Sequence, residues 1–112
     1  WAYAGYSRLY HFVEGNLLWQ TKDHSSSQIA VLLGQIAPEQ IRFHEDRSRI
    51  YRALGQDEDT QVDAGEEALS PGKHQFLLCS DGFWEYILEG EMEGQLKASA
   101  TPQEWLDRMW VL

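Results

Sequence analysis

An aspartate comes directly after a continuous apolar segment, a pattern that can present a carboxylate to a metal ion. Residues 76–79 are Phe-Leu-Leu-Cys, and Ser80-Asp81-Gly82 follows them. A buried strand would fix the backbone here, and Gly82 permits a turn that lets the Asp81 side chain project into a cleft. Hard cations such as Mg²⁺ and Mn²⁺ prefer oxygen ligands held in this way. The alternative is that Asp81 only caps the segment that follows, because Asp-Gly is a common turn pair.

The histidines and the single cysteine favour structural interpretations. His11, His24, His44 and His74 are scattered, and no two of them have the close sequence spacing of a zinc site. His24 lies between an aspartate and a serine, which could suggest a catalytic dyad. Residues of a triad come together in space rather than in sequence, so a structural turn is the favoured interpretation. Cys79 lies in the apolar segment and is expected to be an inert core thiol.

The strands that would position these residues can be read from the apolar pattern. Gln75–Cys79 is apolar without alternation, which predicts a strand buried on both faces. Leu9–Trp19 predicts a β-hairpin with its turn at residues 14–16. Residues 61–64 predict a short exposed strand, and Ser-Pro-Gly at 70–72 predicts a turn.

Three helices are predicted from their capping residues. The first begins near Ser27, has apolar residues at positions 29, 32 and 33 on one face, and ends at Gly34. Pro38 opens a second, short helix. Thr101 and Pro102 open the third, with Trp105, Met109 and Leu112 on one apolar face.

A polar stretch separates these elements in the middle of the chain. It carries four arginines at positions 42, 47, 49 and 52, followed by an acidic loop at 55–59. The arginines could bind phosphate groups through bidentate contacts. A solvated surface helix is the favoured interpretation of this stretch.

The amino-acid composition limits the classes of protein to which this chain can belong. The chain has 112 residues, 43% hydrophobic and 24% charged, which is typical of one globular domain. The net charge of -9 argues against binding nucleic acid or anionic membranes, and no apolar run approaches the ~20 residues of a membrane span. With one cysteine there is no intramolecular disulfide, so a reducing cytoplasmic location is expected. The N-terminus lacks Met and any signal-like segment, and it is interpreted as the interior of a domain.

Four stretches, in this order, resemble motifs of type 2C metal-dependent serine/threonine protein phosphatases. Trp1–Tyr10 contains Gly-Tyr-Ser-Arg and resembles the strand with Gly-Asp-Ser-Arg. Leu18–Ser25 resembles the segment ending Thr-x-Asp-His-Ser, and Ile50–Gly55 resembles Thr-Arg-Ala-Leu-Gly. Phe76–Glu85 resembles Leu-Leu-x-Ser-Asp-Gly-Leu-Trp-Asp. Each motif is weak alone, but four in order with similar spacing are specific.

The resemblance implies a fold and a mechanism. The fold is α/β, part of an α-β-β-α sandwich with antiparallel β-sheets. Members bind two divalent cations, Mg²⁺ or Mn²⁺, and a metal-bridging water attacks the phosphorus of phosphoserine or phosphothreonine. Asp81 matches a direct metal ligand. Glu85 matches the acidic position that helps to hold a weaker third cation, although a solvated carboxylate near a helix N-terminus remains the favoured interpretation of it. The implied setting is bacterial signalling, with phosphoprotein substrates and a protein kinase as partners.

Departures from the family pattern set further expectations. Tyr6 stands where the family has the aspartate of Gly-Asp-Ser-Arg, which argues against a third cation. The upstream Asp-Gly-x-Gly-Gly segment and the final Asp-Asn motif are not in the sequence, so residues 1–112 are interpreted as a partial catalytic domain. The parent protein is therefore expected to be a phosphatase and the fragment alone inactive. A pseudophosphatase or phosphoprotein-binding module is the alternative, and exposed strand edges predict self-association of the fragment.

Overall fold

The computed structural model describes residues 1–53 and 61–112, which form two compact units. Unit 1 comprises Trp1–Arg8 and Thr21–Ala68, and unit 2 comprises Leu9–Gln20 and Leu69–Leu112. The acidic loop at 55–59 and the end of the Ile50–Gly55 motif lie outside the described residues. Helices and antiparallel strands occur together, so the predicted mixed α/β class is confirmed. No helix among the described residues is long and apolar enough to cross a membrane.

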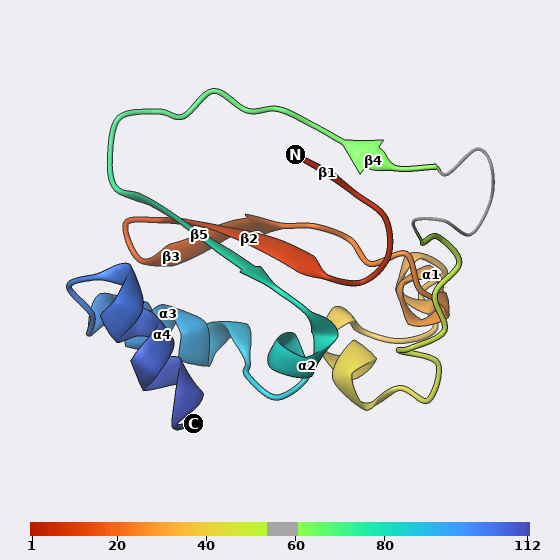
Figure 1. Ribbon diagram of the computed structural model, residues 1–112. Coiled ribbons are helices and arrows are strands. Elements are labelled where there is room, and N and C mark those ends of the chain that lie inside the picture. Colours follow the sequence, from red (N-terminus) through yellow and green to blue (C-terminus); the bar gives the residue numbers. More distant parts are fainter. Residues whose placement is uncertain (54–60) are drawn as a thin grey trace. The chain divides into compact units, whose positions relative to one another are not determined.

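The main sheet of unit 2 has three strands in the order β3-β2-β5 (Figure 1). Strands β2 (Arg8–Val13) and β3 (Asn16–Gln20) form the predicted hairpin, with Val13 opposite Asn16. The two residues between them, Glu14 and Gly15, both have positive φ angles, of 51° and 81°. Such turns match the right-handed twist of paired strands, which explains why glycine stands at the second position.

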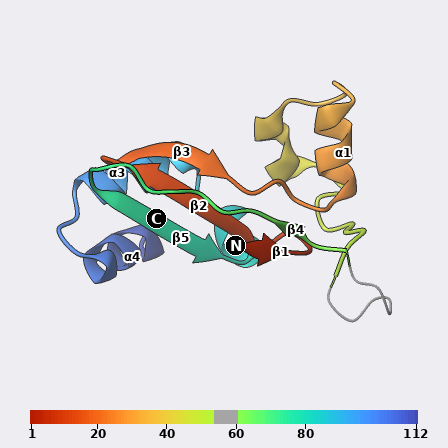
Figure 2. The same cartoon turned by 90° about the horizontal axis from the view of Figure 1, so that it is seen from above.

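Strand β5 (His74–Cys79) lies at the edge of this sheet, antiparallel to β2 (Figure 2). The prediction that this strand is buried on both faces is wrong. Phe76 is 50% exposed and Leu78 is 77% exposed. The two residues alternate with half-buried neighbours, so one face of an edge strand remains accessible. Continuous apolar character alone could not distinguish this arrangement from a central strand.

Three helices complete unit 2: α2 (Asp81–Trp84), α3 (Glu89–Lys97) and α4 (Pro102–Trp110). Helix α4 begins as predicted, because the Thr101 hydroxyl accepts a hydrogen bond from the backbone N–H of Glu104 at 3.1 Å. The indole N–H of Trp105 donates to the Met92 carbonyl oxygen at 3.0 Å and joins α4 to α3. The predicted apolar face is only partly right, because Leu112 lies beyond α4 and is 54% exposed.

The core of unit 2 is built mainly from aromatic and methionine side chains. Phe12 of β2 packs edge-on against the Trp105 ring, with the ring centroids 5.2 Å apart. Such aromatic pairs contribute beyond the area that they bury. The buried apolar residues of this core are Tyr10, Phe12, Trp84, Ile87, Met92, Leu96, Trp105 and Met109.

Unit 1 has less regular structure. A two-residue strand β1 (Ala2–Tyr3) pairs antiparallel with β4 (Asp63–Ala64), which confirms the short exposed strand. Helix α1 (Ser26–Leu32) follows an N-cap at Ser25, whose hydroxyl accepts from the Gln28 N–H at 3.2 Å. The 3-10 helix η1 (Pro38–Phe43) begins at the predicted proline.

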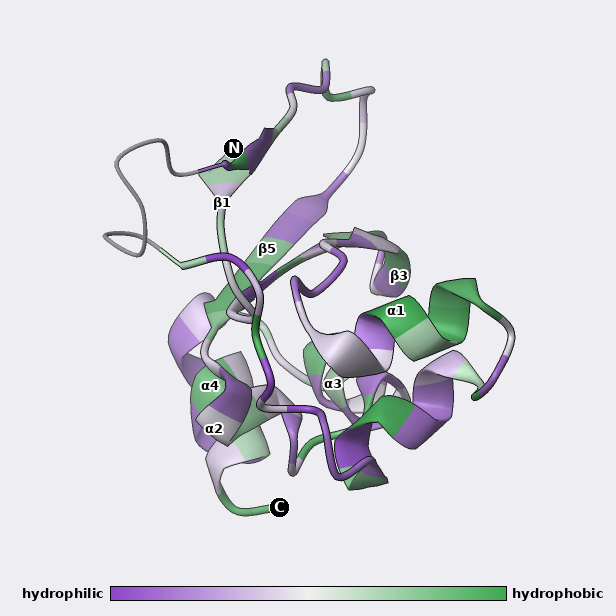
Figure 3. Cartoon of the chain, turned by 90° about the vertical axis from the view of Figure 1, so that its right-hand side faces the viewer, coloured by the Kyte–Doolittle hydropathy of each residue, from purple (hydrophilic) through white to green (hydrophobic). Residues whose placement is uncertain are grey.

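The outer surface of unit 1 differs from two sequence expectations. Figure 3 shows hydrophobic residues along much of the α1 ribbon. The predicted apolar positions Ile29 and Leu32 are exposed, whereas Ser27, Gln28 and Ala30 of the helix are buried. The arginine-rich stretch is not a surface helix. Arg42 is buried in η1, and after Phe43 the chain forms turns up to Ile50. Arginine has good helix propensity, but propensity is a weak prior that tertiary contacts override here.

Candidate functional site

Asp81 follows the end of β5, as predicted, and is the first residue of α2. Figure 1 shows α2 directly after β5. The N-cap of that helix is Ser80, not Asp81. The half-buried Asp81 carboxylate makes no hydrogen bond or ion pair within the described residues, whereas its carbonyl oxygen accepts from the Glu85 N–H at 3.0 Å. The capping alternative therefore lacks the contact that would define it. An aspartate held by a strand and not engaged as a cap fits the role of an oxygen donor to a cation.

Glu85 follows one helical turn after Asp81, at the C-cap of α2, and is half-buried. Residues four apart on a helix lie on the same side, so both carboxylates occupy one side of α2. Within the described residues no group of three or more His, Cys, Asp or Glu side chains is arranged to hold a metal ion. The roles of Asp81 and Glu85 as ligands stay predictions.

A buried ion pair anchors the Gly5-Tyr6-Ser7-Arg8 turn of unit 1. The guanidinium of Arg8 donates two parallel hydrogen bonds to Asp23, at 2.9 Å to Oδ1 and 2.8 Å to Oδ2. Both side chains are almost completely buried. This bidentate geometry is the one that compensates best for removing two charges from water.

The neighbouring residue, His24, joins the same turn to β4. The Gly5 N–H donates to Nδ1 of His24 at 3.0 Å, and Nε2 of His24 lies 2.7 Å from Oδ2 of Asp63. Tyr3 stacks on the imidazole with the ring centroids 4.8 Å apart. His24 is 2% exposed, which agrees with the structural interpretation. Its partner Asp63 is 39 residues away, and no local sequence signal indicates that contact.

Two side chains around His24 have shifted pKa values. The hydrogen bond from His24 lowers the pKa of Asp63 below its usual 3.8, and the nearby Arg52 adds to the effect. Burial raises the pKa of Tyr3, so its phenol stays protonated and donates to the Lys22 carbonyl oxygen at 2.8 Å. Asp63 is therefore the negative partner in this cluster at neutral pH.

Unit 2 contains a histidine pair that the sequence analysis missed. Nε2 of His11 lies 2.9 Å from Nδ1 of His74, and Nε2 of His74 lies 2.6 Å from the Ser70 carbonyl oxygen. Phe76 stacks on His11 with the ring centroids 4.5 Å apart. The two histidines are 63 residues apart, so only the pairing of β2 and β5 brings them together.

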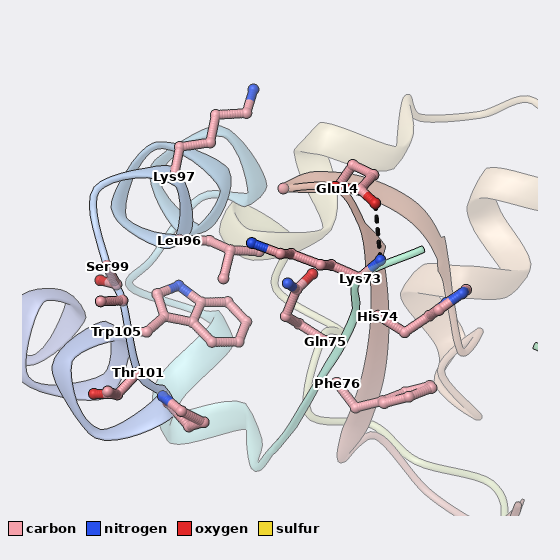
Figure 4. A pocket seen from close by; sticks show the side chains of 13 residues that line it. Glu14, Lys73, His74, Gln75, Phe76, Leu96, Lys97, Ser99, Thr101 and Trp105 are labelled. Carbon is pink, nitrogen blue, oxygen red and sulfur yellow. Dashed lines mark hydrogen bonds between the residues drawn. The ribbon is translucent and has the colours of Figure 1, made fainter. Parts of the chain in front are cut away.

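A cavity of about 830 Å³ also lies in unit 2 (Figure 4). Trp105, Leu96 and Gln75 line it, and the Glu14 carboxylate at its rim accepts from the Lys73 N–H at 2.8 Å. Oε1 of Gln75 is buried there without a hydrogen-bond partner among the described residues. Asp81 does not line this cavity, so the cavity is not part of the predicted metal site.

No family model matches the chain, but several proteins that are similar to it in sequence or fold are named as serine/threonine phosphatases. The serine/threonine phosphatase stp of Listeria monocytogenes is 33% identical over 106 residues, 95% of this chain and 42% of the relative. The serine/threonine protein phosphatase PstP of Mycobacterium tuberculosis is 39% identical over 101 residues, 90% of this chain and 19% of the relative. The chain belongs to the type 2C family of serine/threonine phosphatases.

A solved structure of the PstP catalytic domain in complex with 2 manganese ions supports the same conclusion. It is 28% identical, with a TM-score of 0.73, and the match covers 98% of this chain and 44% of that one. The chain thus spans less than half the length of the type 2C phosphatases that it matches.

The motifs that resemble the type 2C family meet in unit 1 more closely than their sequence spacing indicates. Gly5 and Arg8 belong to the first motif, and they contact the consecutive residues His24 and Asp23 of the second. Tyr51 of the third motif donates its backbone N–H to the His24 carbonyl oxygen at 3.0 Å. The family motifs in this unit therefore form one hydrogen-bonded cluster.

Proposed function

We propose that the complete protein containing these residues is a metal-dependent serine/threonine protein phosphatase. The observation that carries the proposal is identity of 33–39% to named serine/threonine phosphatases over at least 90% of the chain. On this proposal residues 1–112 form part of a longer catalytic domain. Its substrates are phosphoproteins made by a protein kinase, its setting is bacterial signalling, and its location is the cytoplasm.

The cofactor proposed is Mg²⁺ or Mn²⁺. Asp81 fits such a cation, because its carboxylate is an oxygen donor that no described residue engages. Glu85 on the same side of α2 is a second candidate donor. A bound divalent cation would supply positive charge and an activated water for phosphoester hydrolysis. The contribution of this chain is to hold Asp81 in place through β5, whose partner β2 is packed on the aromatic core.

The test compares the complete protein with residues 1–112 alone. The complete protein should hydrolyse a phosphothreonine peptide in about millimolar Mn²⁺ and lose this activity in EDTA. Residues 1–112 alone should show no hydrolysis of the peptide or of p-nitrophenyl phosphate, because one or two carboxylates do not hold two cations. Metal-dependent turnover by the short chain that Asp81→Asn abolishes would contradict this expectation.

A pseudophosphatase is the second candidate, and Tyr6 is the observation that favours it. Tyr6 stands in Gly-Tyr-Ser-Arg where the family motif has an aspartate, and a phenol is a poorer cation ligand than a carboxylate. On this alternative the complete protein binds phosphoproteins without turnover. It would then retain a phosphopeptide in calorimetric titration while the activity assay, with metal present, stays at background.

Self-association of residues 1–112 is a further part of the proposal. Phe76 and Leu78 expose apolar surface on an edge strand, and such edges pair readily with other chains. Light scattering should give a mass above that of the 13.0 kDa monomer, rising with concentration. A constant monomer mass over a wide concentration range would count against it.

A further inference from the structure

His24 is hydrogen-bonded on both edges of its ring, and each bond reaches a different part of unit 1. On one edge, Nδ1 accepts from the Gly5 N–H at 3.0 Å. The backbone strengthens this contact, because the His24 N–H donates to the Gly5 carbonyl oxygen at 2.7 Å. On the other edge, Nε2 faces the Asp63 carboxylate on β4 at 2.7 Å. The ring thus bridges the Gly5–Arg8 turn and β4.

The two partners fix the tautomer of the ring. The Gly5 N–H is a donor, so Nδ1 must offer a lone pair and carry no proton. The proton of the neutral imidazole is then on Nε2, which donates to the Asp63 carboxylate. Nη1 of Arg52 lies 3.4 Å from Nε2, but it is a donor as well and cannot bond to a protonated Nε2. It donates instead to Oδ1 of Asp63 at 3.3 Å.

The ring has no atom left for acid–base chemistry. Both nitrogens are engaged, and the side chain is buried against Tyr3, whose ring lies within 7° of parallel to it. A general base must come within hydrogen-bond reach of the proton that it removes. His24 therefore acts by holding its neighbours in place.

What His24 holds is one end of a short turn. Asp23 binds the other end through the two hydrogen bonds from Arg8, so consecutive residues clamp both ends of the turn. Tyr6 and Ser7 lie between the clamped ends. Arg8 is also the first residue of β2.

We propose that His24 is a positioning residue of the phosphatase. Its Nε2–H tautomer, selected by Asp63, keeps Nδ1 available to hold the Gly5–Arg8 turn and the start of β2. The activity part of this inference rests on the proposed function. The bond to Gly5 is the one that matters for position, and the bond to Asp63 serves to fix the tautomer.

Two amide substitutions at His24 in the complete protein test the hydrogen bonds on the two edges of the ring separately. The amide oxygen of His24→Asn lies roughly where Nδ1 lies and can accept from Gly5, but the side chain is too short to reach Asp63. The amide nitrogen of His24→Gln lies roughly where Nε2 lies and can donate to Asp63, but it leaves the Gly5 N–H without that acceptor. The pair therefore removes one contact at a time.

The expected ranking is that His24→Asn keeps Mn²⁺-dependent turnover within about threefold, whereas His24→Gln loses about tenfold or more, because small displacements are costly in catalysis. Equal loss in both variants, or better retention by His24→Gln, would overturn the proposal. A second readout is the long-range nitrogen–proton NMR spectrum of the wild-type histidine rings. The Nε2–H tautomer is expected for His24, and the Nδ1–H form or a doubly protonated ring at neutral pH would overturn the assignment.

The NMR result does not depend on activity. If the wild-type complete protein shows no turnover, the proposed function fails while the tautomer measurement still tests the bridge. In that case the two variants are ranked by their thermal unfolding temperature instead of turnover. The unfolding temperature of His24→Asn is expected to be higher than that of His24→Gln. The reverse order would overturn the positioning role of the Gly5 contact.

Discussion

Asp81→Asn in the complete protein should reduce Mn²⁺-dependent hydrolysis on the order of 10²-fold or more, because the change removes the negative charge from a cation ligand. The fold should be unaffected. Aspartate and asparagine have nearly the same shape, and the Asp81 carboxylate makes no hydrogen bond within the described residues. The free energy of unfolding should therefore change by no more than about 0.5 kcal/mol. Both quantities should be measured on the same preparation.

Asp107→Asn is the matched control for this variant. It makes the same chemical change on an exposed residue of α4, where the carboxylate accepts a hydrogen bond from the Gln103 side chain at 2.9 Å. Its turnover and stability should match those of the wild type. Unchanged turnover in Asp81→Asn with unchanged stability would contradict the ligand assignment, since a residue that is merely part of a turn tolerates asparagine.

Asp23→Ala should produce the largest loss of stability among single substitutions of buried polar residues in unit 1. The change would leave the Arg8 guanidinium buried without the carboxylate that receives its two hydrogen bonds. Breaking a buried pair by removing one partner costs about 3–5 kcal/mol. Urea unfolding of the complete protein, followed by circular dichroism, measures the effect.

An exposed ion pair in α4 is the control for the buried pair that Asp23→Ala breaks. Nε of Arg108 and Oε1 of Glu104, both on α4, are 3.2 Å apart, and the two side chains are 45% and 41% exposed. Arg108→Ala should cost no more than about 0.5 kcal/mol, because exposed pairs contribute little. A loss below about 1 kcal/mol for Asp23→Ala, or equal losses for the two variants, would show that the buried pair is not what anchors the turn.

The sequence predicted the features that depend on neighbouring residues. Thr101 and Pro102 place the start of α4 because capping and φ preference act within one helical turn. Glu14 and Gly15 place the hairpin turn because a two-residue loop needs positive φ angles. Asp81 was located at the end of β5 for the same reason, since an apolar run followed by Asp-Gly is a local signal.

The features that the sequence did not predict depend on distant contacts. His24 meets Asp63 across 39 residues and His11 meets His74 across 63, and neither partner has a local signature. The exposure of Leu78 depends on whether β5 is central or at an edge, which an apolar run does not reveal. Resemblance to a family limited the range of functions expected for the chain, but only the structure showed that His24 and Asp23 bind the two ends of one turn.

The most direct test is a calorimetric titration of Mn²⁺ into the complete protein and its Asp81→Asn variant. It measures whether Asp81, presented by β5, binds a divalent cation, as we propose for phosphoester hydrolysis. The expected result is weaker Mn²⁺ binding in the variant, by about tenfold or more, with an unchanged unfolding temperature. Equal affinity and equal stoichiometry in the two proteins would contradict the claim, whatever the phosphatase assay shows.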